Sequence, residues 1–290
     1  GSAKPANEYR VFVIGDSSTW GTLLRPEETL AGMLDAAGLT TADGREVKVY
    51  NLGYPTLSLV KDLMILDRAM QYEPDLILWP VTLESFPRNR QLESPIVANN
   101  TQSVANLIDR FDLNLEQPEE TTSFWDKTLI GERRALADLL RLQLYGVMWS
   151  ATGVDQTYPT DYEPAARDLE ADETFNNWQP GDMTNDDLAF EVIAAGMQLA
   201  GDVPVVLINE PVLVSVGQNS DIRYNFYYPR WAYDQYREML GDQCQASNWN
   251  CLDLWDFVPE GRFTNSAIHL DPIGEQVVVD KLVRSVLEKN

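Results

Sequence analysis

The sequence has few of the residues that several common kinds of functional site require. Its 290 residues include one histidine and two cysteines, and 22 Lys and Arg stand against 45 Asp and Glu, a net charge of −23. Nucleic acids and anionic membrane surfaces are bound by clustered Lys and Arg, so nucleic acid is excluded as a partner. A single histidine excludes a multi-histidine metal centre, and we expect no metal and no other cofactor.

Long apolar runs and phosphate-binding loops are also missing. No stretch of 18 apolar residues occurs, so no segment is predicted to span a membrane. The Gly-x-x-x-x-Gly-Lys-Ser/Thr loop and a Gly-x-Gly-x-x-Gly after a strand are absent, which argues against nucleotide chemistry. The Gly-x-Ser-x-Gly elbow of α/β-hydrolases is absent as well.

The two cysteines, Cys244 and Cys251, are separated by six residues in a polar segment. They are either joined by a disulfide or present as two free thiols, and we favour the disulfide. A disulfide implies an oxidising compartment, so we predict an extracytoplasmic protein, secreted or anchored at the cell surface. Residues 1–3 resemble an expression scar, and we therefore expect that a signal peptide or membrane tether has been removed.

What the sequence does have is a regular alternation of short apolar runs and amphipathic segments. Strands are predicted at 11–14, 46–51, 75–81, 203–208 and 250–254, and helices at 27–37, 57–71, 186–200, 230–240 and 272–287. This order predicts an α/β fold with a three-layer, doubly wound, flavodoxin-like parallel sheet of about five strands.

One domain is predicted over residues 1–290, interrupted after the third strand. Residues 85–182 are polar and rich in proline, with helical spacing at 104–111 and at 132–148. A stretch of this length inside a compact domain is not expected to be pure loop. We predict a long, partly helical insertion that forms a cap or substrate-binding region beside the strand ends.

Small polar residues follow the first predicted strand where that strand ends. The run from Val11 to Ile14 stops at Gly15, and the next residues are Asp16, Ser17, Ser18 and Thr19. Open α/β folds bind their ligands at the carboxyl edge of the sheet. The lone histidine, His269, follows the last predicted strand, so we expect Ser17 and His269 to share a pocket at that edge.

Four segments resemble, in the usual order, the conserved blocks of the SGNH/GDSL hydrolase superfamily. They read GDSSTWG at 15–21, NLGYPTLS at 51–58, PDLILWPVTLES at 74–85 and NSAIHLDPIGE at 265–275. The resemblance implies that Ser17 is a nucleophile and that His269 is its general base. The chemistry agrees, because a serine hydroxyl attacks only when a base within hydrogen-bond reach takes its proton.

The resemblance also implies an oxyanion hole. Its donors are expected to be the backbone N–H of Ser17 and one in the second block, at Gly53 or at Thr56, which stands where the family has a glycine. The family's third block supplies an asparagine, but the matching position here is Glu84. A carboxylate repels an oxyanion, so either the nearby Thr82 substitutes for the asparagine, or Glu84 points elsewhere, or the site is altered.

The aspartate that the family places three or four residues before the histidine is missing, and Asn265 and Ser266 stand there instead. Groups that could orient His269 are Asn265, Asp16, Glu84 and Glu210. Asp253, Asp256 and Asp271 are further carboxylates near strand ends, and each is equally explained as a loop acid or a helix cap.

Within this superfamily, the chain most resembles proteins that add or remove O-acyl groups on surface carbohydrates. We therefore predict a serine esterase or O-acyltransferase whose substrate is a small-molecule or carbohydrate O-acyl ester, in particular an O-acetyl ester. Arg223 to Asn225, with Tyr227, Tyr228 and Trp231, either contact sugar or pack internally. The alternative function is a catalytically impaired SGNH-fold protein that binds surface glycan or a partner, with Glu84 and Asn265 as signs of the loss.

Overall fold

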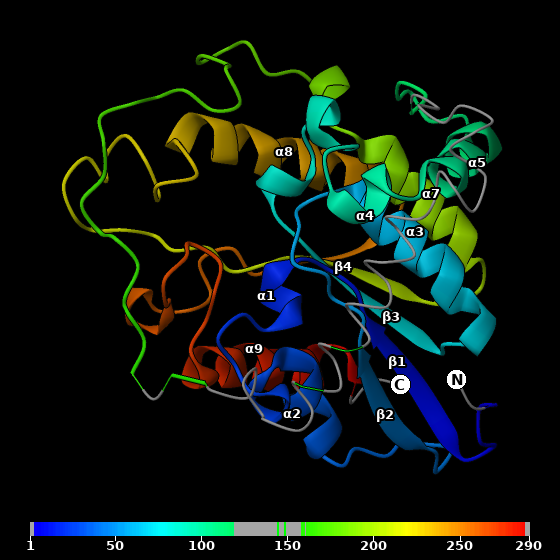
Figure 1. Cartoon of the computed structure of the whole chain (residues 1–290). Coiled ribbons are helices and arrows are strands. Elements are labelled where there is room, and N and C mark those ends of the chain that lie inside the picture. The colour runs from blue at the N-terminus through cyan, green and yellow to red at the C-terminus, as the bar shows by residue number, and fades with distance from the viewer. Residues whose placement is uncertain (1–2, 119–143, 145–147, 149–157, 160, 288–290) are drawn as a thin grey trace.

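A five-stranded parallel sheet forms the centre of the computed structural model, which describes residues 3–118, 144, 148, 158–159 and 161–287 (Figure 1). The strand order is β2-β1-β3-β4-β5. The strands are β1 (Glu8–Val13), β2 (Glu46–Asn51), β3 (Leu76–Val81), β4 (Val205–Asn209) and β5 (Asn250–Asp253). This topology confirms the predicted fold class, and it places a switch point between β1 and β3, where such folds bind ligands.

Helices cover both faces of the sheet. One layer contains α3 (Leu59–Ala69), α7 (Phe190–Ala200) and α8 (Arg230–Ala246), and the other contains α2 (Leu30–Ala36) and α9 (Pro272–Ser285) (Figure 1). Along β3, Ile77 and Trp79 pack in the first layer, while Leu76 and Leu78 pack in the second. Because side chains of a strand alternate between faces and both faces are buried here, the central strands β3 and β4 are continuous apolar runs in the sequence.

The predicted insertion after β3 is partly helical where the structure describes it. It contains η4 (Arg88–Arg90), α4 (Pro95–Ala98) and α5 (Thr101–Phe111), and it is flanked by η3 (Leu83–Ser85) and η6 (Asn185–Asp187). Helices α4 and α5 pack against α3 and thicken that layer. Residues 161–183, green in Figure 1, instead run past the loops at the carboxyl edge, where Leu169 N–H donates to Gln218 O at 3.1 Å.

The helix predicted over 132–148 falls almost wholly outside the described residues. Among the helices of the described part, none has the length and apolar character needed to cross a membrane. The helix predicted to begin near residue 186 begins instead at Phe190, because Asn185–Asp187 forms a separate 3₁₀ turn closed by the Thr184 and Asp187 capping box. The remaining short helices are α1 (Ser17–Trp20), η1 (Pro26–Glu28), η2 (Met70–Tyr72) and η7 (Glu260–Arg262).

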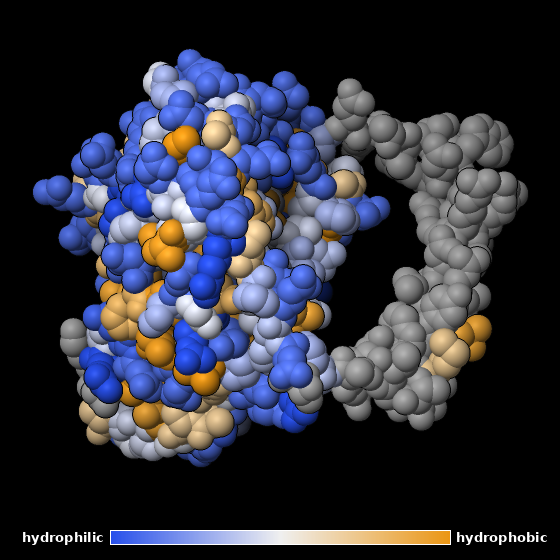
Figure 2. All heavy atoms as spheres, turned by 90° about the vertical axis from the view of Figure 1, so that its left-hand side faces the viewer, coloured by the Kyte–Doolittle hydropathy of each residue, from blue (hydrophilic) through white to orange (hydrophobic). Residues whose placement is uncertain are grey.

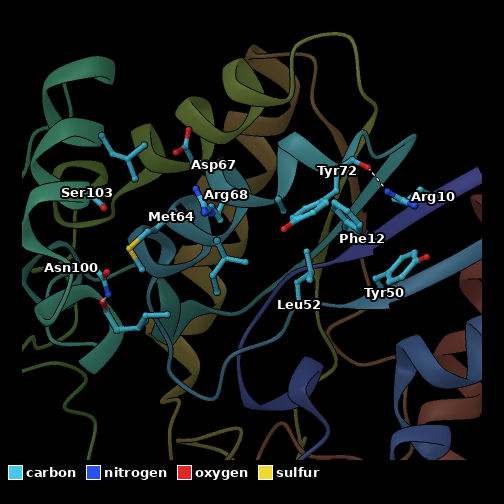
Figure 3. Close-up of a pocket in the computed structure, with 14 residues that line it drawn as sticks. Arg10, Phe12, Tyr50, Leu52, Met64, Asp67, Arg68, Tyr72, Asn100 and Ser103 are labelled. Atoms are coloured by element: carbon cyan, nitrogen blue, oxygen red, sulfur yellow. Dashed lines mark hydrogen bonds between the residues drawn. The ribbon is translucent and has the colours of Figure 1, made fainter. Parts of the chain in front are cut away.

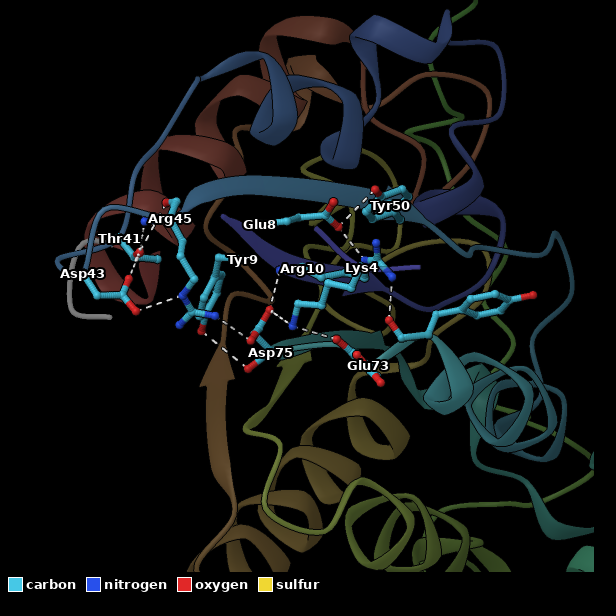
Figure 4. A network of polar contacts seen from close by, with 11 residues as sticks. Lys4, Glu8, Tyr9, Arg10, Thr41, Asp43, Arg45, Tyr50, Glu73 and Asp75 are labelled. Carbon is cyan, nitrogen blue, oxygen red and sulfur yellow. Dashed lines mark hydrogen bonds and ion pairs between the residues drawn. The ribbon is translucent and has the colours of Figure 1, made fainter. Parts of the chain in front are cut away.

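Two features hold the periphery of the sheet. At its amino edge Asp75 accepts the Arg10 N–H at 2.6 Å and pairs with Lys4 at 2.5 Å and Arg45 at 2.8 Å (Figure 4). A disulfide between Cys244 and Cys251 joins the end of α8 to β5, which confirms the predicted pairing. Both features lie away from the Gly-Asp-Ser segment and serve the scaffold.

Candidate active site

The Gly-Asp-Ser segment leads into a single helical turn, α1 (Ser17–Trp20), directly after β1. Asp16 precedes the turn and accepts the Ser18 N–H at 2.8 Å, and Gly21, with φ of 85°, ends it. Ser17 is the first residue of the turn and is partly buried. The N–H of a first helical residue has no intrahelical partner, so the Ser17 amide is left for another acceptor.

The second block lies directly against α1. A Cβ at Gly53 would be 2.5 Å from Trp20 N and 2.8 Å from the Thr19 carbonyl carbon, so glycine is needed for this close approach. Asn51 ties the two segments together, since its Nδ2 donates to Thr19 O at 2.7 Å. The same side chain accepts the Gly53 N–H through Oδ1 at 2.9 Å.

The two ends of the chain meet at Ser17 and His269, as the sequence predicted. His269 Nε2 lies 2.8 Å from Ser17 Oγ, across 252 positions of sequence. On the other side of the ring, Nδ1 lies 3.1 Å from Asn265 Oδ1. An amide oxygen is purely an acceptor, so it places the imidazole proton on Nδ1 and leaves the Nε2 lone pair facing the serine.

Electrostatics favour the neutral form of this imidazole. Burial lowers the pKa of His269, and the Asp16 carboxylate opposes part of that effect. The ring is therefore largely unprotonated at neutral pH, the state in which it can accept a proton from Ser17.

Three of the predicted oxyanion donors are already engaged. The Thr82 hydroxyl shares a hydrogen bond of 3.0 Å with the Tyr228 hydroxyl, and Thr82 is completely buried. The Gly53 N–H is held by Asn51, and the Thr56 N–H donates to Tyr54 O at 2.7 Å. Of the predicted donors, the Ser17 amide is the one that the described contacts leave for an oxyanion.

Among the described residues, Asn265 is the candidate orienter that bonds to His269, and the other candidates have different partners. Asp16 caps α1, and Glu84 forms an ion pair with Arg90. Burial raises the pKa of Glu84, although Arg90 opposes this. These two predictions are therefore wrong as contacts to the imidazole.

The carboxylates near the other strand ends have structural partners too. Glu210, directly after β4, accepts the Ser18 hydroxyl and does not bond to His269. Asp253 accepts Asn209 Nδ2 at 2.8 Å and pairs with Arg237 at 2.7 Å, while Asp256 is exposed. Asp271 caps α9 by accepting the Gly274 N–H at 2.7 Å.

The aromatic residues that the sequence offered as sugar contacts belong mostly to the interior. Tyr224 and Tyr228 are buried, and Arg223 donates to Asn225 O at 3.1 Å. The Trp231 indole N–H is also taken up, since it donates to Glu173 O at 2.6 Å. Packing is therefore the correct one of the two readings for Tyr224 and Tyr228.

Sequence reasoning missed Trp20, which is 54% exposed although it is large and aromatic. Positions three apart lie on the same face of a helix, so Trp20 shares a face of α1 with Ser17. The signal was present in the sequence, as a tryptophan inside the Gly-Asp-Ser block. Figure 2 views the molecule from the left-hand side of Figure 1 and shows apolar patches within a mostly hydrophilic surface.

A second, roomier cavity has a different lining. It measures about 730 Å³ and is bounded by β1, β2, α3 and α5, with Phe12, Tyr50, Met64 and Leu107 in its wall (Figure 3). Neither Ser17 nor His269 is among the residues that line it. Within the described part of the chain, no cluster of three or more His, Cys, Asp or Glu is placed to hold a metal ion.

No protein-family model matches the chain, and no curated protein matches it by sequence. Solved structures similar to it include a lipolytic protein of the G-D-S-L family from Veillonella parvula DSM 2008, with 10% identity, a TM-score of 0.45, and 96% of this chain and 98% of the other covered. A lipase/acylhydrolase from Enterococcus faecalis has 15% identity, a TM-score of 0.48 and coverages of 96% and 94%. A carbohydrate acetylesterase family member from Sinorhizobium meliloti has 12% identity, a TM-score of 0.42 and coverages of 96% and 96%.

Proposed function

We propose that this protein is a serine esterase or O-acyltransferase that forms an acyl-enzyme on Ser17. The observation that carries the proposal is the hydrogen bond of 2.8 Å between Ser17 Oγ and His269 Nε2. A nucleophile bonded to a base, with a third group on the far side of the base, is the arrangement that activates a serine hydroxyl. The third group here is the neutral amide of Asn265.

The reaction follows from this geometry. His269 Nε2 takes the proton of Ser17 as Oγ attacks the ester carbonyl carbon, and the tetrahedral oxyanion is stabilised by the Ser17 N–H. The imidazolium then gives its proton to the leaving alcohol, which leaves the acyl group on Ser17. Water or an acceptor hydroxyl, deprotonated by His269, attacks this acyl ester and frees the serine. Hydrolysis and transfer differ in which acceptor arrives.

We assign the substrate to the O-acetyl esters of carbohydrates. Trp20 supports this assignment, because an exposed indole on the same face as the nucleophile can stack on the apolar face of a sugar ring. The described part of the inserted region 85–182 adds residues 161–183, which pass the same edge of the sheet (Figure 1). The Cys244–Cys251 disulfide supports an oxidising, extracytoplasmic location.

The test compares the wild-type protein with Ser17→Ala and with Ser103→Ala, a matched change on α5. We expect turnover of p-nitrophenyl acetate and of an acetylated oligosaccharide by wild type and Ser103→Ala, and a loss of at least about 10³-fold in Ser17→Ala. A fluorophosphonate probe should label the peptide that contains Ser17. If wild type turns over neither ester and Ser17 stays unlabelled, the enzyme proposal is wrong, and glycan binding without turnover would support the impaired binding protein instead.

A further inference from the structure

A small cavity of about 30 Å³ lies against Ser18 and Thr19 of α1, and two carboxyl groups are among its lining. Glu210 enters it from the end of β4 and Glu275 from α9, and both side chains belong to residues that are at most 5% exposed. The rest of the wall is mainly apolar, with Ile208, Ile268 and Leu270 among its residues. A cavity of this volume holds about one water molecule.

Two oxygen atoms around this cavity are buried without a hydrogen-bond partner among the described residues. The Ser18 hydroxyl donates to Glu210 Oε2, but Glu210 Oε1 has no hydrogen-bond partner among the described residues. Thr19 Oγ1, also in the wall, lacks one as well. Buried polar atoms are normally hydrogen-bonded, so these two atoms call for a shared proton or water.

Within the part of the chain that the structure describes, no positive charge pairs with Glu210. The Lys61 ammonium, which is fully buried, is committed to Asp62 at 2.5 Å and to Gly15 O at 2.7 Å. The titratable groups that face Glu210 from the neighbouring elements are all acids or phenols: Asp16, Asp62, Glu275, Tyr233 and Tyr236. An isolated buried carboxylate is so unfavourable that such a group keeps its proton instead.

We propose that Glu210 is a positioning residue, held as a neutral carboxylic acid, which fixes α1 and therefore Ser17 through the Ser18 hydroxyl. This proposal rests on the proposed function. The proton sits on Oε1 and is shared through one water with Thr19 Oγ1 and Glu275. Asp16 accepts a hydrogen bond from the Ser18 backbone N–H, and Glu210 accepts one from the Ser18 hydroxyl. The turn that carries the nucleophile is therefore fixed through both the backbone and the side chain of Ser18.

Electrostatics agree with this assignment. Burial raises the pKa of Glu210 well above its ordinary value, and the Asp16 carboxylate raises it further. Burial also raises the pKa of Glu275 to about 8, with Asp271 acting in the same direction. Ionising Glu210 would place a negative charge beside Asp16 and the oxyanion, so activity should be complete while Glu210 is protonated and should fall as pH rises through its pKa.

The decisive variant is Glu210→Gln, because an amide has the shape and hydrogen-bonding groups of a neutral carboxylic acid but does not titrate. We expect its kcat at neutral pH to stay within about threefold of wild type. From neutral to strongly alkaline pH, wild-type kcat should fall by about tenfold or more at unchanged KM, while Glu210→Gln changes by less than about twofold. Glu191→Gln on α7 is the matched control and should behave like wild type.

Glu275→Gln adds a test of coupling between the two acids. Removing the Glu275 charge lets Glu210 ionise more easily, so the alkaline fall in kcat should move to lower pH. If the role of Glu210 were purely structural, neither Glu210→Gln nor Glu275→Gln would change the alkaline fall in kcat. Loss of activity in Glu210→Gln at neutral pH, or an alkaline fall that persists in it, would overturn the proposal.

A readout without turnover separates this proposal from the proposed function. The thermal midpoint of Glu210→Gln should match wild type at neutral pH and exceed it at alkaline pH, because the variant has no buried charge to form. If wild type shows no esterase activity but this stability pattern appears, the neutral acid is established and the enzyme proposal alone fails. If Glu210→Gln unfolds below wild type at every pH, the neutral acid is disproved.

Discussion

Replacing Asn265 by aspartate tests how the imidazole is held. Asn265 Oδ1 already lies 3.1 Å from His269 Nδ1, so Asn265→Asp puts a carboxylate where a neutral amide oxygen now accepts the hydrogen bond. A full charge pair about 4 Å apart is worth about 1 kcal/mol in water and about 4 kcal/mol at an effective dielectric constant of 20. Asn265 is exposed and His269 is partly buried, so we take a value of about 1–2 kcal/mol, or roughly a tenfold increase in kcat.

The pH dependence of kcat/KM tests the direction of the charge effect on His269 independently of the size of the rate change. His269 must be neutral to act as a base, so kcat/KM rises with pH through the pKa of this residue in the free enzyme. A carboxylate at 265 stabilises the imidazolium and raises that pKa, which moves the acid limb of the profile to higher pH. The assay is hydrolysis of p-nitrophenyl acetate across the pH range, with Asn248→Asp, an exposed residue after α8, as the control for added charge.

A kcat within about twofold of wild type together with an unmoved acid limb would refute the assigned role of Asn265. Asn265→Ala distinguishes orientation from charge. It removes the acceptor for the Nδ1 proton without adding charge, so kcat should fall by about tenfold or more. Equal activities of the alanine, asparagine and aspartate forms would mean that His269 is oriented by other contacts.

Three further predictions concern the substrate surface, the buried acids and the disulfide. Trp20→Ala should raise KM for an acetylated oligosaccharide by about 3–10-fold, with little change in KM for ethyl acetate. The control Tyr72→Ala, at the opposite edge of the sheet, should change neither KM. Equal effects of Trp20→Ala on both esters would contradict the stacking role. Glu275 has a pKa of about 8 in the folded protein but near 4.5 when unfolded. As pH rises from about 4.5 to about 8, the unfolding free energy of wild type should therefore fall by roughly 4–5 kcal/mol more than that of Glu275→Gln. Urea unfolding at several pH values measures this, and parallel plots of unfolding free energy against pH for the two proteins would contradict it. Replacing Cys244 and Cys251 together by serine opens a short loop and should cost about 2 kcal/mol in unfolding free energy, and reductant should lower the thermal midpoint of wild type alone.

The fold was accessible from sequence because strands buried on both faces are short, continuous apolar runs. β1, β3 and β4 are fully buried along their lengths and were predicted to within a few residues. The strand-end rule then brought Ser17 and His269 together without any knowledge of the structure. Short-range periodicity and topology were sufficient for these two conclusions.

Side-chain partners were less accessible, because they depend on contacts that sequence spacing does not encode. Thr82 follows β3 as expected, yet Tyr228, 146 positions later, takes its hydroxyl. Glu84 was identified as anomalous, but its partner Arg90 comes from the next short helix. The role of Glu210 depends on Ser18, 192 positions away, and no pattern in either segment announces that bond.

The Gly-Asp-Ser-Ser-Thr segment divides its polar groups between chemistry and anchoring. Ser17 forms the hydrogen bond to the imidazole, and Asp16 caps the turn. The Ser18 hydroxyl donates to Glu210, and Thr19 is buried. A four-residue helix has too little backbone hydrogen bonding to be stable by itself, so these side-chain contacts have to define its position. The nucleophile is therefore placed by the anchoring groups around it, and changes to Asp16 or Ser18 should affect kcat although neither residue contacts His269.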